Sequence, residues 1–197
     1  MTREHDAPRP PDRSVSLDHF VGMYEAKTDP WDNASKWSDQ RKYAVTMASL
    51  PRERYRRCYE PGCAVGLLTR LLAPRCDEIL AVDAVPEAVR TAAEAVRDFP
   101  HVTVERAILP ADLPSGTFDL IVIGDLLYYL SADDLNDLLT GLRARLEPGG
   151  EIVAVHYRDR SGETWDGAHA HSVLAELGLE SVIHHDDEWF VLDVWKA

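Results

Sequence analysis

The sequence predicts an α/β protein built on a doubly wound, mostly parallel sheet of seven strands. From residue 57 onward, short apolar segments alternate with helical segments, which is the pattern of right-handed β-α-β units. A loop containing Gly62 and Gly66 joins the first strand-like segment to a helical one. The last two apolar segments are separated by a short acidic turn, Asp186-Asp187, so we expect an antiparallel hairpin at one edge of the sheet.

Two helices are expected before this sheet. Residues 1–16 are polar and rich in proline, and we expect a disordered tail there. Residues 17–24 and 36–50 are predicted to be helical, because turn-forming residues separate them and Pro51 ends the second. These helices would form a lid over the rest of the chain.

The core elements are read from apolar runs and the turn residues that bound them. Strands are expected at residues 57–60, 79–83, 102–106, 120–124, 152–156, 179–184 and 189–195. Helices are expected at residues 66–73, 86–98, 132–146 and 168–177, the third ending in a Leu-Glu-Pro-Gly-Gly turn at 146–150. The chain of 197 residues therefore predicts one domain, with lid helices in 17–56 and a core in 57–197.

Composition excludes several classes of partner. The net charge of −13 argues against nucleic acid, because a nucleic-acid binder usually neutralises phosphates with a basic face. No apolar run reaches the length of a membrane span and no secretory signal is recognisable, so we expect a cytoplasmic protein without membrane contact. The three cysteines are too few and too irregularly spaced for a disulfide framework or a zinc site. The stretch His184–Glu188 is interpreted as an exposed hairpin turn, and no metal is expected.

The loop Glu60–Gly66 predicts a nucleotide-type pocket. Its glycines let the backbone approach a ligand, and the helix that follows presents free N–H groups. Glu60, directly before the glycines, would repel a pyrophosphate but would attract a cationic amine. The loop therefore favours S-adenosylmethionine over NAD as the cofactor. Asp83 ends the second strand, 21 residues after Gly62, where a carboxylate can accept both ribose hydroxyls; the alternative is the N-cap of the next helix.

A second group of candidates follows the buried strand that begins at Phe118. This strand ends in Gly124 and Asp125 and should lie beside the first strand, at the point of an open α/β sheet where ligands bind. Tyr128 and Tyr129 follow on the rim. We expect them to contact substrate, with packing against the neighbouring helix as the alternative for one of them.

Taken together, these motifs resemble those of class I S-adenosylmethionine-dependent methyltransferases, whose fold is Rossmann-like. The E-x-G-x-x-x-G loop, the acid ending the second strand, the F-D-L-I strand and the L-x-P-G-G turn occur in the right order. Other motifs narrow the resemblance to the nodulation protein S-like (NodS-like) group, over about residues 17–197. They are Asp29-Pro-Trp31, Trp37-x-x-x-Arg41-Lys42, Leu50-Pro-Arg52, Leu127-Tyr-Tyr-Leu130, Val155-His156 and Leu192-Asp-Val-Trp195.

The resemblance implies a role for each matching residue. Glu60 would hold the methionine amine, Asp83 the ribose, and the segment after Ala107 the adenine. Ile108 stands where many relatives have an acid that accepts the adenine amino group, so a backbone group would replace that contact. The residues assigned to the cofactor are Trp31, Trp37, Arg41, Glu60, Gly62, Cys63, Ala64, Gly66, Asp83, Ala84, Ala107, Ile108, Gly124 and Asp125. The two tryptophans have an alternative role as core anchors of the N-terminal helices.

The implied activity is methyl transfer to a small-molecule acceptor. Members resembling nodulation protein S methylate an amine on a sugar, which suggests N-methylation of an amino sugar or a related amine. O-methylation, a NAD-dependent oxidoreductase and a non-catalytic binding domain are the alternatives. Asp125, His156 and His171 are candidates for removing the proton of the acceptor, although a lone histidine is more often structural. Tyr24, Tyr128 and Tyr129 are the candidates for substrate binding.

Overall fold

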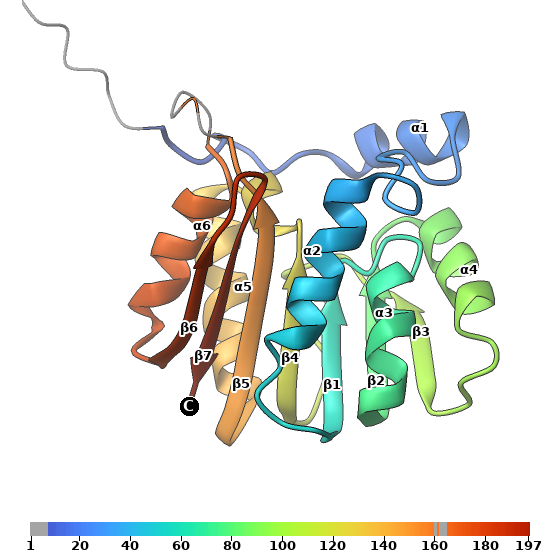
Figure 1. Cartoon of the computed structure of the whole chain (residues 1–197). Coiled ribbons are helices and arrows are strands. Elements are labelled where there is room, and N and C mark those ends of the chain that lie inside the picture. Colours follow the sequence, from blue (N-terminus) through green and yellow to red (C-terminus); the bar gives the residue numbers. More distant parts are fainter. Residues whose placement is uncertain (1–7, 160, 162–164) are drawn as a thin grey trace, which may run out of the picture.

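The seven strands form one sheet in the order β3-β2-β1-β4-β5-β7-β6, which confirms the predicted fold class (Figure 1). The structure is a computed structural model that describes residues 8–159, 161 and 165–197. The strands are β1 Tyr55–Pro61, β2 Cys76–Asp83, β3 Val102–Arg106, β4 Phe118–Gly124, β5 Leu146–Tyr157, β6 Glu180–Asp186 and β7 Phe190–Lys196. β1 to β5 pair in parallel, whereas β7 pairs antiparallel with both β5 and β6. The C-terminal hairpin is thereby confirmed.

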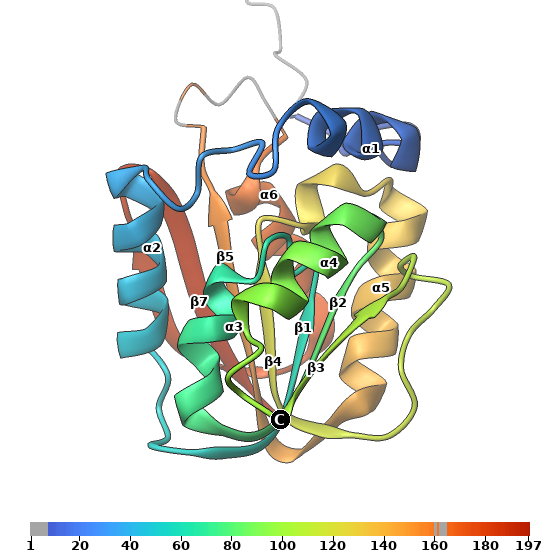
Figure 2. The same ribbon diagram turned by 90° about the vertical axis from the view of Figure 1, so that its right-hand side faces the viewer.

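Helices cover both faces of the sheet. They are α1 Leu17–Ala26, α2 Trp37–Ala48, α3 Leu67–Leu72, α4 Pro86–Ala95, α5 Ala132–Arg145 and α6 Gly167–Leu174, with short 3-10 turns η1 Ala73–Arg75, η2 Leu127–Tyr129 and η3 Ala175–Leu177. One apolar core packs α2, α3 and α4 against the sheet, and a second packs α5 and α6 against the other face. Figure 2 shows α1 lying across the carboxyl ends of the parallel strands. The predicted helices are all present, with ends that differ by a few residues.

The centre of the sheet explains why its strands read as continuous apolar runs. Every residue of β4 from Phe118 to Ile123 is buried, because helices cover the sheet on both sides. The turn predicted at 146–150 is instead the first part of the long strand β5, where Leu146 already pairs with Phe118 and the register then shifts. The glycines there join the strand rather than reverse the chain.

The N-terminal segment differs from the prediction. The backbone N–H of Val15 donates to the carbonyl of Tyr129 (2.8 Å), and the Ser14 hydroxyl accepts the N–H of Ser131 (2.9 Å). Ser16 caps α1 by accepting the N–H of His19. The expectation of disorder up to residue 16 is therefore wrong for its last residues, since backbone hydrogen bonds fix a polar segment without an apolar core. Residues 1–7 lie outside the described part of the chain.

The turn between β6 and β7 also differs in one respect. The turn is present, but Asp187 is buried rather than exposed, and it accepts hydrogen bonds from Arg41 and from the N–H of Trp189. Within the described residues, none of the helices is both long and apolar enough to span a lipid bilayer.

Candidate functional site

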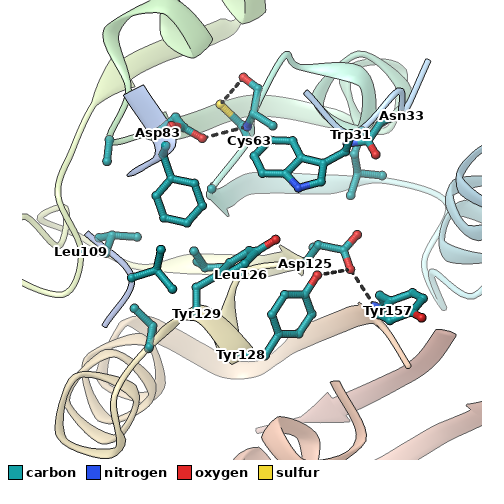
Figure 3. A pocket seen from close by; sticks show the side chains of 18 of the residues that line it. Trp31, Asn33, Cys63, Asp83, Leu109, Asp125, Leu126, Tyr128, Tyr129 and Tyr157 are labelled. Atoms are coloured by element: carbon teal, nitrogen blue, oxygen red, sulfur yellow. Dashed lines mark hydrogen bonds between the residues drawn. The ribbon is translucent and has the colours of Figure 1, made fainter. Parts of the chain in front are cut away.

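A pocket of about 970 Å³ lies at the carboxyl ends of the parallel strands. This volume is near the upper end of the ~300–1,000 Å³ typical of small-molecule sites, which gives room for a cofactor together with an acceptor. The loops after β1, β2, β3 and β4 form its base, and side chains of α1 and α2 close it from above. In Figure 3, Cys63 and Asp83 lie on one side of the pocket and Asp125, Tyr128 and Tyr157 on the other.

The glycine loop has a backbone that other residues could not adopt easily. Gly62 has a φ of 73° and Gly66 a φ of 77°, both in the left-handed region. A Cβ atom on Gly66 would lie 2.9 Å from the Cα atom of Ala92, so α3 and α4 could not pack as closely. The N–H groups of Gly62 and Cys63 both donate to the carbonyl of Val82. Gly62, Cys63 and Ala64 line the pocket, whereas Gly66 shapes the loop from behind.

Glu60 provides a test of whether the pocket fits a cationic amine. Glu60 lines the pocket at the end of β1, yet the residue is only 3% exposed. Its Oε2 atom is buried without a hydrogen-bond partner in the protein. Burial raises the pKa of Glu60 to about 8, with Asp83 adding to the rise and the Thr69 hydroxyl opposing it. A buried carboxyl group with one unpartnered oxygen is costly on its own, and an ammonium group is a fitting partner for it.

Asp83 joins the glycine loop to the start of α4. Its Oδ2 atom accepts the N–H of Ala64 (3.0 Å) and its Oδ1 atom accepts the N–H of Val85 (2.9 Å). Burial raises the pKa of Asp83, while backbone N–H donors, including Ala84, oppose the rise. Asp83 and Ala84 both line the pocket, and the Asp83 carboxylate also supports the start of α4 through the N–H of Val85.

The predicted adenine side is lined by Ala107, Ile108 and Leu109. The N–H of Ile108 donates to the Asp112 carboxylate (2.9 Å), and the Ile108 carbonyl accepts the N–H of Asp112. Both backbone groups of Ile108 are thus engaged by a side chain and backbone within the same loop. The expectation that a backbone group replaces the acid found in many relatives stays a prediction.

Asp125 is held firmly at the other side of the pocket. It has a φ of 47°, unusual for a residue with a side chain, and its N–H donates to the carbonyl of Val155. Its Oδ1 atom accepts hydrogen bonds from the Tyr157 N–H (2.7 Å) and the Tyr128 hydroxyl (3.1 Å). Its Oδ2 atom forms an ion pair with Lys42 of α2. Three donors therefore fix this carboxylate.

Lys42 is a residue that the sequence reasoning missed as a site candidate. It is buried, lines the pocket and also pairs with Asp39 (2.8 Å). Burial lowers its pKa, but Asp125 and Asp39 more than offset this, so the pKa is raised overall and the ammonium keeps its charge. The available signal was its place directly after Arg41 in the motif Trp37-x-x-x-Arg41-Lys42.

Of the three predicted lid residues Trp31, Trp37 and Arg41, only Trp31 lies at the pocket. Trp31 lines the pocket and packs against the rings of Phe20 and Tyr24. Trp37 is 74% exposed and outside the pocket, so it is neither a pocket residue nor a core anchor. Arg41 points to the C-terminal hairpin, where it pairs with Asp187, and does not line the pocket.

The two candidate histidines lie behind the pocket wall. His156 and His171 are buried and bonded to each other, and neither lines the pocket. Successive strand residues point to opposite faces, so Tyr157 enters the pocket while His156 points toward α6. Of the three predicted proton acceptors, Asp125 is the one that the fold places at the pocket.

The three candidate substrate residues all line the pocket. Tyr128 and Tyr129 contact each other edge-on at 4.7 Å, and Tyr129 also packs against Phe20 of α1. The Tyr24 hydroxyl is buried without a partner in the protein. Several pocket residues had no motif to mark them: Asn33, Ser38, Asp39, Tyr43, Leu126, Tyr157, Trp165, Trp189 and Phe190.

The strand order and the pocket define a class I S-adenosylmethionine-dependent methyltransferase. The chain belongs to the Nodulation protein S (NodS) family, whose family model matches residues 22–186. This confirms the resemblance read from the sequence and sets aside the oxidoreductase alternative.

Relatives with known names agree with this family. The chain is 28% identical to Nodulation protein S of Rhizobium tropici over 169 residues, covering 81% of the chain and 71% of that protein. It is 29% identical to Nodulation protein S of Sinorhizobium fredii over 164 residues, covering 81% and 75%.

Two crystal structures share the fold. A candidate methyltransferase from Pseudomonas syringae is 41% identical, with a TM-score of 0.75, covering 82% of this chain and all of that one (100%). The N-methyltransferase NodS from Bradyrhizobium japonicum WM9, in complex with S-adenosylhomocysteine, has a TM-score of 0.81 at 22% identity, covering 90% and 96%. At that identity, the second likeness supports the fold alone.

Proposed function

We propose that this methyltransferase transfers its methyl group to the amine of a small molecule. The observation that carries the proposal is the composition of the pocket wall beneath α2. Carboxylates of Asp39 and Asp125 lie there, together with the rings of Tyr43, Tyr128 and Tyr157. The Lys42 ammonium pairs with both carboxylates and offsets one of their two negative charges, so the wall keeps one net negative charge. Carboxylates and aromatic faces both attract a cationic group, so this wall favours an amine that arrives protonated.

The residues proposed to hold the cofactor are those at the strand ends. Glu60 would pair with the methionine amine, and Asp83 would accept the ribose hydroxyls. Ala107, Ile108 and Leu109 would flank the adenine. S-adenosylmethionine supplies a methyl group on a positively charged sulfur, which already carries its own leaving group.

The protein's main contribution is then to align the acceptor. Asp125, fixed by three donors, can accept a hydrogen bond from the acceptor nitrogen and direct its lone pair toward the methyl group. The protonated amine gives its extra proton to water, and the neutral amine that remains is a sufficient nucleophile. An alcohol needs a stronger base during attack, and the described lining residues include no histidine to serve as one. This difference favours N-methylation over O-methylation.

The names of relatives support the same proposal. The Bradyrhizobium japonicum NodS is described as an N-methyltransferase. The residues that line the pocket also include Trp165, Trp189 and Phe190. The acceptor is thus proposed to have an apolar face next to its amine, which an amino sugar also offers.

The test is a transfer screen with tritiated S-adenosylmethionine over amino sugars, alkyl amines, aryl amines, phenols and alcohols. We expect label on amines, with the modified nitrogen identified by mass spectrometry. The Glu60→Gln variant is the matched control and should transfer little label to any acceptor. Label on phenols or alcohols alone would exclude the proposed acceptor class.

We also propose the cytoplasm as the location of the protein. Cys58, Cys63 and Cys76 are free thiols and all are buried. Free thiols are typical of a reducing compartment.

A further inference from the structure

Four side chains form a hydrogen-bonded series that runs from the surface to the back of the pocket wall. We call His184, Asp193, His171 and His156 the histidine chain. His184 Nδ1 lies 2.7 Å from Asp193 Oδ1, and Asp193 Oδ2 lies 2.6 Å from His171 Nδ1. His171 Nε2 lies 2.9 Å from His156 Nδ1. The chain links β6, β7, α6 and β5, and the His184 end is 60% exposed.

The inner end of the histidine chain fixes the tautomers of His156 and His171. The backbone N–H of Leu127, in η2, donates to His156 Nε2 (3.1 Å), so that nitrogen must keep its lone pair. The ring proton of neutral His156 therefore sits on Nδ1 and is donated to His171 Nε2. His171 in turn carries its proton on Nδ1 and donates it to the carboxylate of Asp193. All of these buried groups are then satisfied at once.

An additional proton would break this arrangement. If either His156 or His171 became charged, two N–H groups would face each other, either between the rings or at Leu127. Burial lowers the pKa of His156 well below its usual value, and the charge of Lys42 acts in the same direction, as a protonated His171 would. Burial raises the pKa of Asp193, but its hydrogen bonds to His171 and His184 lower the pKa by more than this. The net pKa lies below the usual value, so this carboxylate stays ionised.

The histidine chain ends at η2, the turn that carries the pocket residue Tyr128. Tyr128 lies in η2 next to Leu127, and its ring contacts the His156 ring edge-on at 5.6 Å. The Tyr128 hydroxyl donates to Oδ1 of Asp125. The backbone hydrogen bond and the ring contact together place Tyr128 against Asp125.

We propose that His156 is a positioning residue, held as its Nδ1–H tautomer by His171 and Asp193, which anchors η2 and so sets Tyr128 and Asp125 for the acceptor. The inference rests on the proposed function, because it assigns Asp125 to the acceptor side of the pocket. It also gives His156 a role that does not require contact with substrate. The lone pair that a general base would need is occupied by the Leu127 N–H.

Two substitutions at position 156 separate anchoring from simple packing. In His156→Gln the side-chain carbonyl can still accept the Leu127 N–H, whereas His156→Leu fills similar space without an acceptor. We expect His156→Leu to lower kcat/KM for the acceptor at least about tenfold, because it leaves a buried N–H unpaired. His156→Gln should stay within about threefold of the wild type. Affinity for S-adenosylhomocysteine should change by less than about threefold in both.

The control is His101→Gln. His101 is a partly buried histidine that also bonds a backbone group, the carbonyl of Ala73, far from the pocket. The His101→Gln substitution should leave both kcat/KM for the acceptor and the affinity for S-adenosylhomocysteine unchanged. Equal losses in His156→Gln and His156→Leu, or full activity in His156→Leu, would overturn the proposal.

A measurement on the wild-type protein decides the matter even if a variant fails to fold. Proton–nitrogen NMR of histidine-labelled protein should show His156 and His171 as neutral Nδ1–H tautomers at neutral pH, and exchange of the Leu127 amide should be slow. A charged ring or an Nε2–H tautomer at His156 would refute the inference. These readouts do not depend on the acceptor, so failure to methylate any amine would count against the proposed function alone.

Discussion

The buried carboxyl group of Glu60 makes the affinity for the cofactor depend on pH. Without ligand its pKa is about 8, so the group is mostly protonated at neutral pH. If it receives the methionine amine, ligand binding must expel that proton, since only the carboxylate pairs with an ammonium group. The perturbation is therefore pH itself, compared between the wild type and Glu60→Gln.

The size of the effect follows from the pKa. With a value of about 8, about one Glu60 in ten is ionised at pH 7 and about one in a hundred at pH 6. The affinity for S-adenosylhomocysteine should thus rise about tenfold per unit between pH 6 and 7.5, and level off above about pH 8. At pH 7, each binding event should release about 0.9 proton.

Isothermal titration calorimetry in buffers of different ionisation enthalpy measures both quantities. Glu60→Gln should bind at least about tenfold more weakly at pH 8 and release no proton, because the amide does not titrate in this range. A wild-type affinity that is flat between pH 6 and 8, or equal proton release in both proteins, would show that the amine binds elsewhere.

The same carboxyl group affects stability without ligand. Its pKa is raised from the model-peptide value of 4.5 to about 8, so the folded state binds the proton more tightly than the unfolded state. Relative to Glu60→Gln, the wild type should therefore lose about 1.4 kcal/mol of unfolding free energy per pH unit between about pH 5 and 7.5. Urea unfolding across this range measures it, and parallel pH profiles would contradict it.

The remaining predictions concern the loop and the lid. Asp83→Ala should weaken S-adenosylhomocysteine binding at least about a hundredfold, because two hydrogen bonds from the ribose hydroxyls, of about 1.5 kcal/mol each, are lost. Unchanged affinity would show that the ribose binds elsewhere. Lys42→Met should lower the unfolding free energy by about 2 kcal/mol or more, because it strands the Asp125 carboxylate, and an unaltered melting temperature would argue against the buried ion pair. Gly66→Ala should cost about 1–3 kcal/mol, whereas Gly22→Ala in α1, where a Cβ meets nothing within 4 Å, should not destabilise the protein; equal effects would refute the steric argument.

Much of the fold followed from local patterns. Three features depend on residues that are neighbours in the chain. They are the buried strand β4, the start of α4 at Pro86 and the C-terminal hairpin of β6 and β7. Glu60, Asp83 and Asp125 were found because each stands at or directly after the carboxyl end of a strand, and parallel strands bring these ends to one edge of the sheet. Periodicity and turn chemistry are therefore enough for these features.

Other features required side chains from distant elements. Trp37 and Arg41 share a motif with Lys42, yet only Lys42 reaches the pocket, because neighbouring residues on a helix point in different directions. His156 was assigned to the pocket for its place near a strand end, but the pleat turns it to the other face. No pattern of neighbouring residues shows which side chains from distant elements a given helix or strand residue will contact.

The sequence by itself determined the order of strands and helices, the cofactor loop and the acid that favours a cationic ligand. These are set by the backbone preferences and charges of a few consecutive residues. The tertiary structure alone decided that the Glu60 carboxyl group is buried with its Oε2 atom unpartnered, and that Lys42 pairs with Asp125. It alone also decided that three histidines and Asp193 form one hydrogen-bonded series. Burial and hydrogen bonding depend on what packs around a side chain, and those neighbours come from far away in the sequence.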